Sequence, residues 1–260
     1  MKIMCAIPIF KDKYNSNPLY SCIDYMSYID YMDFHPFPDK AIMIFQSSLN
    51  KYFAAKAEKT WSFSLGKAHL IKYLGKSIVV CGDFGIGAPA AVIMLEALAA
   101  SGVKTLISIG SAGAISNELD IADCLICKSA LRDEGTSWHY EGGENYSYAD
   151  KGLTEKFASY LKNTDIPFFT GSSWTIDAPY METREEIRAY SSKGIKTVEM
   201  EASALFIVAR KRGIKMTSAF VISDILYSKD WKPRFHSKKV TKRLERLSEE
   251  ALSFFAFTKG

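Results

Sequence analysis

The fold is indicated first by residues 77–100, which read SIVVCGDFGIGAPAAVIMLEALAA. Residues 77–82 form a short apolar run of the kind found in buried strands, and residues 89–100 follow a helical pattern. Gly85 and Gly87 lie between the two. Glycine lets the backbone approach a ligand closely, and the N–H groups at a helix start favour an anion. The segment therefore predicts a strand, a ligand-binding turn and a helix of an α/β fold.

The turn also matches the dinucleotide-binding signature GxGxxA, from Gly85 to Ala90. That signature requires an acidic residue about 20 positions later, which binds the ribose hydroxyls of the cofactor. No Asp or Glu lies between Glu96 and Glu118. We therefore do not expect a dinucleotide cofactor.

Short apolar runs alternate with longer helical patterns along the rest of the chain, which favours a largely parallel or mixed sheet covered by helices. The predicted strands are 41–45, 77–82, 105–110, 123–128, 168–172 and 217–223. The predicted helices are 89–100, 154–162, 183–191, 201–212 and 238–255. No internal repeat or low-complexity linker interrupts this order. Residues 1–260 are therefore predicted to form a single α/β domain, with a mixed central sheet flanked by helices.

Residues 1–40 differ in character from the rest of the chain because they are rich in tyrosine. Tyr25, Tyr28 and Tyr31 recur every three positions, a spacing that lines one face of a helix. We interpret this tyrosine stripe as a packing surface.

Composition and charge exclude several classes of protein. With 48% hydrophobic and 24% charged residues the chain lies in the globular range. The formal net charge is only +4, and much of the excess lies in the last 30 residues, so we predict no nucleic-acid partner. No run approaches the ~20 apolar residues of a membrane span, and the first ten residues do not form a recognisable signal peptide. We expect a cytoplasmic protein without a membrane partner.

The five cysteines are scattered and odd in number, as in reduced cytosolic proteins. Cys124 and Cys127 form a CxxC within a strand-like apolar run. Their offset of three residues places the two thiols on opposite faces of a strand. We therefore predict no metal or redox site there, and no metal-binding spacing elsewhere.

Two further segments carry residues suited to a site. Residues 108–114 read SIGSAGA, and small-residue turns at the ends of consecutive strands would lie side by side at one sheet edge. Residues 198–204 read VEMEASA, a strand end running into a helix, and Asp224 follows the apolar run 217–223. Glu201 and Asp224 suit a reaction that needs both a hydroxyl clamp and an acid. Composition alone leaves them equally well explained as helix-capping or solvated acids.

The chain resembles the nucleoside phosphorylase superfamily in four runs, GIGAPAA at 85–91, GSAG at 110–113, VEMEA at 198–202 and SD at 223–224. That superfamily includes purine nucleoside phosphorylases, uridine phosphorylases and methylthioadenosine/adenosylhomocysteine nucleosidases. The resemblance extends from about residue 40 to the C-terminus. It implies an enzyme that cleaves the N-glycosidic bond of a nucleoside, with inorganic phosphate as co-substrate and no other cofactor.

The resemblance also implies a role for each matched residue. Asp224 would protonate N7 of the purine as the bond breaks, and Glu201 would accept hydrogen bonds from the ribose hydroxyls. Met200 and Glu199 would lie against the same sugar. The residues on the phosphate side would be Gly85, Gly87 and Ser111. The sugar carries positive charge in the transition state and the base leaves as an anion unless protonated, so the acid contributes ~100- to 10,000-fold.

The chain departs from the family pattern at the phosphate. Phosphorylases usually carry a Gly-Asp-Pro motif followed by an arginine, which residues 1–40 lack, and an arginine where this chain has Ser108. Nucleosidases, which use water, place a glutamate after their first strand, and residues 1–10 contain no acid. A water-using nucleosidase, a uridine phosphorylase and a non-catalytic nucleoside-binding protein of the same fold therefore remain alternatives. Asp224 favours a purine, because uridine phosphorylases tend to have Asn-Arg at 223–224.

Residues 132–140, RDEGTSWHY, resemble the uridine phosphorylase version of this segment. Arg132 would supply positive charge to phosphate, or alternatively pair with Asp133 or Glu134. The base-binding candidates are Thr136, Ser137, Trp138 and Trp174. Members of the superfamily commonly form dimers that complete each other's sites, often within hexamers. This implies a homo-oligomer, with residues 1–40 as its expected interface.

Overall fold

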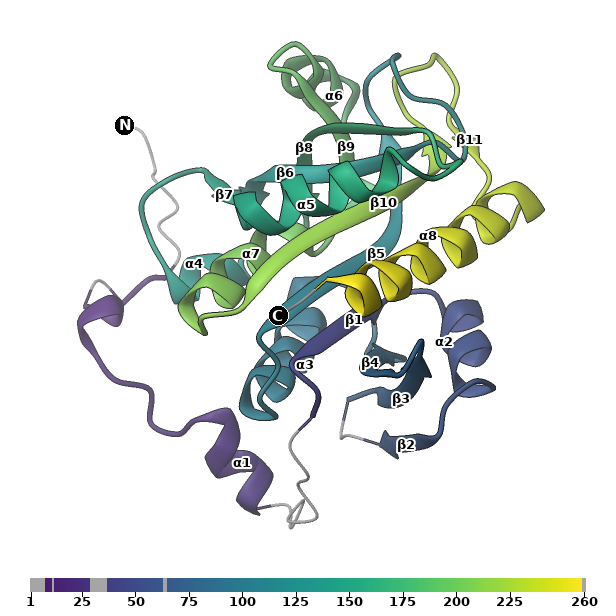
Figure 1. Cartoon of the computed structure of the whole chain (residues 1–260). Helices are drawn as coiled ribbons and strands as arrows, with labels where there is room; N and C mark the ends of the chain where they lie inside the picture. Colours follow the sequence, from purple (N-terminus) through teal and green to yellow (C-terminus); the bar gives the residue numbers. More distant parts are fainter. Residues whose placement is uncertain (1–7, 11, 29–36, 63–64, 259–260) are drawn as a thin grey trace.

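A mixed sheet of eleven strands lies at the centre of the part that the computed structural model describes, namely residues 8–10, 12–28, 37–62 and 65–258 (Figure 1). The strand order is β11-β10-β6-β8-β9-β5-β1-β4-β3-β2, and β7 pairs with β6. The strands are β1 (Lys40–Ile44), β2 (Lys59–Ser62), β3 (Lys67–Tyr73), β4 (Lys76–Gly82), β5 (Thr105–Ala114), β6 (Cys124–Asp133), β7 (Tyr146–Tyr148), β8 (Phe168–Ile176), β9 (Ile195–Glu199), β10 (Lys215–Ile225) and β11 (Lys232–Pro233).

Strand β5 connects the two halves of the sheet. It pairs in parallel with β1 and β10, and its last residues pair antiparallel with β9. Because β10, β6, β8 and β9 follow one another and β9 returns to β5, these five strands close into a ring. Since β4, β1, β5 and β10 run parallel, their carboxyl ends meet at one edge. The mixed α/β architecture predicted from the sequence is confirmed.

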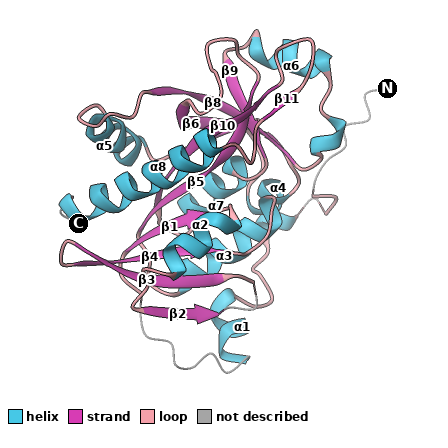
Figure 2. Cartoon of the chain, turned by 90° about the vertical axis from the view of Figure 1, so that its right-hand side faces the viewer, coloured by secondary structure: helices cyan, strands magenta, loops and turns pink. Residues whose placement is uncertain are grey.

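Two layers of helices cover the sheet (Figures 1 and 2). The apolar residues of α3 and α7 share one core with one face, and those of α2, α5 and α8 share a second core with the other. Helix α6 packs on β8 and β9 in a smaller cluster. The helices are α1 (Cys22–Tyr28), α2 (Ser47–Ala54), α3 (Ala88–Ala100), α4 (Thr136–Tyr140), α5 (Lys151–Leu161), α6 (Arg184–Ser191), α7 (Ala202–Lys211) and α8 (Lys238–Phe257), with 3-10 turns η1 (Lys13–Asn15) and η2 (Pro179–Met181).

The structure corrects the predicted strands in two ways. Strands β5 and β10 continue beyond 110 and 223, and β1 separates β4 from β5, so the two small-residue clusters are not on neighbouring strands. The sequence prediction also missed β2, β3, β7 and β11. These strands are short or carry exposed charged residues, such as Lys67 and Lys72 of β3, and tertiary pairing stabilises them rather than an apolar run.

The tyrosine stripe is not packed as expected. Helix α1 buries Met26, whereas the side chains of Tyr25 and Tyr28 are 43% and 85% exposed. Tyr31 lies outside the described residues. Within the chain, the stripe therefore contributes little to the core, and the interpretation as a packing surface is wrong for the two tyrosines that the structure describes.

The two cysteines of the CxxC lie in different cores, Cys124 with α2, α5 and α8 and Cys127 with α3 and α7, so their thiols face opposite sides of β6 as predicted. Burial raises the pKa of both thiols. In the described ranges, no three His, Cys, Asp or Glu side chains are grouped so that they could hold a metal ion. Over the same ranges, no helix has the length and apolar character needed to cross a membrane.

Candidate active site

The glycine turn between β4 and α3 takes a backbone conformation that only glycine adopts readily. Gly85 and Gly87 have φ of +97° and +92°, where a side chain would strain the backbone. The N–H of Gly87 donates to Oε1 of Glu201 at 2.7 Å. A Cβ on Gly87 would also lie 4.0 Å from the terminal methyl of Met200. The turn therefore meets the VEMEA segment directly, although 114 residues separate Gly87 from Glu201.

Glu201 stands at the N-cap of α7 and is half-buried. Burial and the charge of Glu199 raise its pKa to about 8, while hydrogen bonds from the amides of Gly87 and Met200 lower it. A carboxyl with so high a pKa carries a proton for part of the time at neutral pH. It can therefore donate as well as accept a hydrogen bond, which suits contact with sugar hydroxyls.

Glu199 faces inward, which corrects its predicted contact with ribose. Its Oε1 accepts hydrogen bonds from the hydroxyls of Thr175 (2.6 Å) and Ser173 (3.2 Å). Its Oε2 accepts from the main-chain N–H of Glu201 (2.9 Å) and Ala202 (2.7 Å). Both carboxyl oxygens are thus occupied within the protein, and burial raises the pKa of the group. Glu199 caps the start of α7 and fixes the main chain that carries Glu201.

The small residues of β5 lie inside the strand, not in a turn as predicted. Gly113 pairs with Val198 of β9 on one side and with Asp224 of β10 on the other. A Cβ at Gly113 would come within 3.3 Å of Oδ2 of Asp224 and 2.2 Å of a methyl of Leu226. Glycine at this position therefore leaves room for the side chain of Leu226, which packs over it. The two strand pairings place the VEMEA segment and Asp224 on either side of one residue.

Asp224 lies near the end of β10, where the register with β5 shifts between Ile222 and Asp224. Its side chain is buried, and burial raises its pKa. Oδ1 accepts from the Ser223 hydroxyl and Oδ2 from the Trp231 indole N–H, each at 2.8 Å. These two hydrogen bonds lower the pKa again. The contact with Trp231 was not predicted, because nothing in the sequence indicates that β11 folds back on β10.

The predicted phosphate side is uncharged where relatives are expected to carry an arginine. The Ser108 hydroxyl lies in the core, 2.6 Å from the hydroxyl of Ser218. Ser111 is half-buried and accepts a hydrogen bond from Nε2 of Gln46 at 3.1 Å. Gln46 directly precedes α2. The polar groups on this side of the site are therefore neutral amides and hydroxyls.

Arg132 does not supply the missing charge, which corrects the sequence prediction. Nε of Arg132 donates to the Ser137 hydroxyl at 2.9 Å, and the two terminal nitrogens donate to the main-chain oxygens of Glu144 (2.8 Å) and Glu141 (2.5 Å). The guanidinium also stacks on the ring of Trp138, 3.9 Å from its centroid. The arginine is buried and organises the segment 137–144. The alternative pairing with Asp133 or Glu134 is absent from the ion pairs of the described residues.

Two of the predicted base-binding residues are structural. Trp174 is fully buried on β8, where its indole N–H donates to Asp133 at 2.9 Å and its ring packs against Tyr190. Ser137 is also fully buried, between Arg132 and Glu134. Neither side chain can reach a nucleoside without opening the core. Thr136 is half-buried at the start of α4, and its contact with a base stays a prediction.

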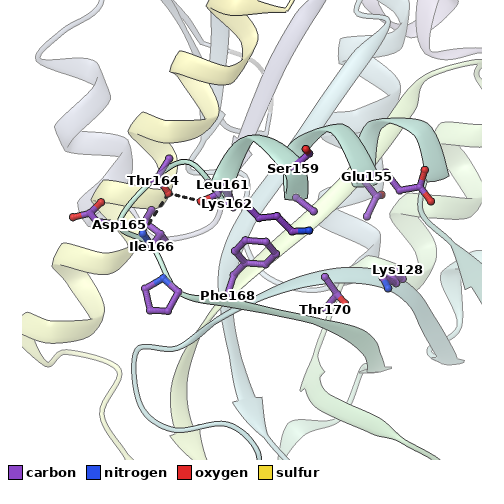
Figure 3. A pocket seen from close by; sticks show the side chains of 13 residues that line it. Lys128, Glu155, Ser159, Leu161, Lys162, Thr164, Asp165, Ile166, Phe168 and Thr170 are labelled. Atoms are coloured by element: carbon purple, nitrogen blue, oxygen red, sulfur yellow. Dashed lines mark hydrogen bonds between the residues drawn. The ribbon is translucent and has the colours of Figure 1, made fainter.

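A separate cavity of about 1040 Å³ lies between α5 and the strands β6 and β8. Figure 3 shows the side chains of Lys128, Lys162 and Phe168 there, with Glu155 and Thr170. None of the predicted site residues lines it. Its position beside the first residues of β8 sets it apart from the ends of β9 and β10, where Glu201 and Asp224 lie.

Comparison with known proteins finds relatives among nucleoside phosphorylases. The guanosine phosphorylase of Halorubrum lacusprofundi is 29% identical over 143 residues, which are 55% of this chain and 59% of the relative. The uridine phosphorylase of Thermococcus kodakarensis is 31% identical over 162 residues, 57% and 58% of the two chains. The matched stretch thus spans about three fifths of each relative's length.

Solved structures share the fold. The uridine phosphorylase of Vibrio fischeri superposes with a TM-score of 0.74 at 23% identity and covers 85% of this chain and 93% of its own. The purine nucleoside phosphorylase of Toxoplasma gondii superposes with a TM-score of 0.75 at 18% identity and covers 85% and 92%. Residues 42–253 match the family model of the phosphorylase superfamily. The chain belongs to this superfamily.

Proposed function

We propose that the protein cleaves the N-glycosidic bond of a purine nucleoside, with inorganic phosphate as the second substrate. The observation that carries the proposal is the pairing of Gly113 with Asp224 on one side and with Val198 on the other, which places the acid and the segment that bears Glu201 on the two strands that flank one residue. Two carboxyls with raised pKa values at one sheet edge suit a reaction that needs both an acid and a sugar clamp.

In this proposal Asp224 protonates the purine as it leaves. The bond between C1′ and the base nitrogen breaks with its electron pair moving to the base, and the sugar becomes positively charged. Burial raises the pKa of Asp224, so that the acid form is available to give a proton to the base. A uridine phosphorylase has less need of such an acid, and we therefore favour purine substrates although the relatives include both kinds.

Glu201 and Met200 would bind the ribose, and Glu199 would hold Glu201 in place through its main chain. The amide of Gly85 before α3, together with the hydroxyl of Ser111, would face the phosphate, whereas the N–H of Gly87 already donates to Glu201. The amino end of a helix favours an anion. All of these donors are neutral, so we expect weaker phosphate binding than an arginine-bearing site would provide.

A nucleosidase that uses water is a second candidate, because the position where phosphorylases usually carry an arginine holds Ser108, a neutral residue that pairs with Ser218 in the core. One experiment separates the two reactions: base release from inosine, guanosine and adenosine is followed in buffers with and without inorganic phosphate. Release that requires phosphate and yields ribose 1-phosphate supports the proposal. Equally fast release without phosphate supports the nucleosidase, and binding without release supports a non-catalytic protein.

We also propose that the protein is a cytoplasmic homo-oligomer. The described cysteines are all free thiols, as expected in a reducing compartment. Large apolar side chains are exposed on the N-terminal segment, where Leu19 is 96% and Tyr28 85% exposed. Sedimentation at micromolar concentration should show a dimer or hexamer, and a monomer alone would contradict the proposal.

A further inference from the structure

The hairpin from β10 to β11 brings an unpredicted side chain onto Asp224. Asp224 pairs with Pro233, and Ile225 pairs with Lys232, so the connection 226–231 leaves the sheet and returns to it beside the acid. Trp231, at the end of this connection, donates its indole N–H to Oδ2 of Asp224 at 2.8 Å. The last residue of the connection, Trp231, therefore contacts the proposed proton donor.

The two partners differ in burial. Asp224 is 6% exposed, whereas Trp231 is 60% exposed and its ring lies 6.1 Å from that of Phe235, measured between centroids. A mostly exposed indole thus bonds to an almost wholly buried carboxyl. Because Trp231 contributes little to the core, its displacement would leave the packing around β10 intact.

The connection is held at its middle by the neighbouring segment. The guanidinium of Arg184, the first residue of α6, donates to the main-chain oxygens of Ser228 (3.3 Å) and Lys229. Just before Arg184, the carboxyl of Glu182 is half-buried, and burial together with the charges of Asp224 and Glu186 raises its pKa to about 7. This segment therefore lies within electrostatic reach of Asp224.

The hydrogen-bond chemistry of the three groups limits where a proton can sit. An indole N–H can only donate, so it requires Oδ2 of Asp224 to be an acceptor. A hydroxyl can donate or accept, and Ser223 also lies 3.4 Å from the main-chain oxygen of Ala112, to which it can turn. In the observed arrangement Ser223 donates to Oδ1 and Trp231 donates to Oδ2, so both carboxyl oxygens accept and the anion is favoured. A proton could sit only on Oδ1, and only after Ser223 had turned toward Ala112.

We propose that Trp231 is a positioning residue that controls the protonation of Asp224, holding it as an anion in the empty site and releasing it when a base enters. When the indole leaves, the carboxylate takes one proton from solvent. That proton passes to the base nitrogen as the bond to C1′ breaks, and the electron pair of that bond stays with the base. The consequence for turnover rests on the proposed function, whereas the effect on the carboxyl does not.

The charges that face Asp224 support an effect of the indole itself. Across the sheet, β5 presents Gly113 and β11 presents Pro233, neither of which is charged. The segment before α6 presents Glu182, whose negative charge favours the protonated acid. The hydrogen bonds donated by Trp231 and Ser223 act in the opposite direction and lower the pKa of Asp224.

The test compares Trp231→Phe, which keeps a ring but loses the N–H, with Phe235→Leu, which removes the neighbouring ring but leaves the N–H. The pKa of Asp224 is measured in the substrate-free protein by carbon-13 NMR of the aspartate carboxyls, with Asp224→Asn to assign the signal. Trp231→Phe should raise this pKa by about one pH unit, because a hydrogen bond to a charged acceptor contributes at least that much. Phe235→Leu should leave it unchanged. An unchanged pKa in Trp231→Phe, or equal shifts in both variants, would overturn the proposal.

The same variants are then compared in turnover. A reaction that needs protonated Asp224 slows as pH rises, and Trp231→Phe should move this decline in kcat/KM to higher pH by the same amount. An active parent whose pH profile is unaltered by Trp231→Phe contradicts the inference alone. A parent that releases no base from any purine nucleoside contradicts the proposed function, and the NMR titration still decides the role of Trp231.

Discussion

The ribose end and the base end of the site are built differently. At the ribose end, Glu199 accepts four hydrogen bonds from buried donors, and Glu201 is tied to Gly87 across the molecule. At the base end, Asp224 accepts only two, one of them from an exposed indole on a hairpin. A fully satisfied buried network holds one geometry, whereas a partner on an exposed loop can leave at little cost. The contrast indicates a rigid sugar clamp beside an adjustable acid.

The largest effect is expected at the base end. Asp224→Asn should lower kcat on purine nucleosides by ~100- to 10,000-fold, because the amide cannot donate a catalytic proton to the base. Steady-state kinetics across pH, with thermal unfolding as a check on the fold, measures this. Asp165→Asn is a suitable control, since Asp165 is an exposed acid that pairs with Arg246. Parental activity of Asp224→Asn at every pH would remove Asp224 from the mechanism.

The ribose end should respond with a smaller loss that depends on the sugar. Glu201→Gln should weaken turnover of ribosides by ~2- to 10-fold, because the raised pKa makes Glu201 a largely neutral partner at pH 7 and a neutral hydrogen bond contributes about 0.5–1.5 kcal/mol. The loss should be greater for ribosides than for 2′-deoxyribosides. Paired kinetics on inosine and 2′-deoxyinosine measure the difference, and equal losses would show that Glu201 does not contact the 2′-hydroxyl.

Arg132 separates the sequence prediction from the structure. The sequence predicted that Arg132 binds phosphate, whereas in the structure its guanidinium is used within the segment 137–144. Arg132→Ala should lower the free energy of unfolding by about 1–3 kcal/mol, since it removes the donor to the buried Ser137 hydroxyl and to two partly buried main-chain oxygens. The KM for phosphate should change little. Urea unfolding and phosphate saturation curves give the two values. A tenfold rise in that KM with unchanged stability would restore the original prediction.

A further difference concerns how stability depends on pH. The folded-state pKa of Glu201 is about 8, above its ordinary value of 4.5, so the folded protein binds a proton more tightly than the unfolded chain. The stabilisation that comes from this tighter proton binding is fully present below about pH 4.5 and is lost as pH rises through 8. Because glutamine does not titrate, the Tm of Glu201→Gln should rise relative to the Tm of the parent as pH increases from 4.5 to 8. An identical pH dependence of Tm in both proteins would show that the pKa of Glu201 is not raised in this way.

Local pattern was sufficient for much of the fold and part of the site. Apolar runs and helical spacing located β4, α3, β6 and α8, because each buries a continuous face that the sequence displays. The two glycines of the turn were recognisable because their conformation excludes other residues. The position of Glu201 at the start of a helix followed from the change of pattern at 198–204.

Long-range pairing decided the rest. Whether Ser111 and Gly113 form a turn or a strand depends on β9 and β10 on either side, which local sequence does not show. The side chains of Arg132 and Glu199 point inward because other segments supply their partners, an acceptor for Arg132 and a donor for Glu199. Trp231 reaches Asp224 only because β11 folds back on β10. The sequence by itself determined which residues are chemically able to act, whereas the tertiary structure decided which of them remain available, since each hydrogen-bonding group is used first by its neighbours in space.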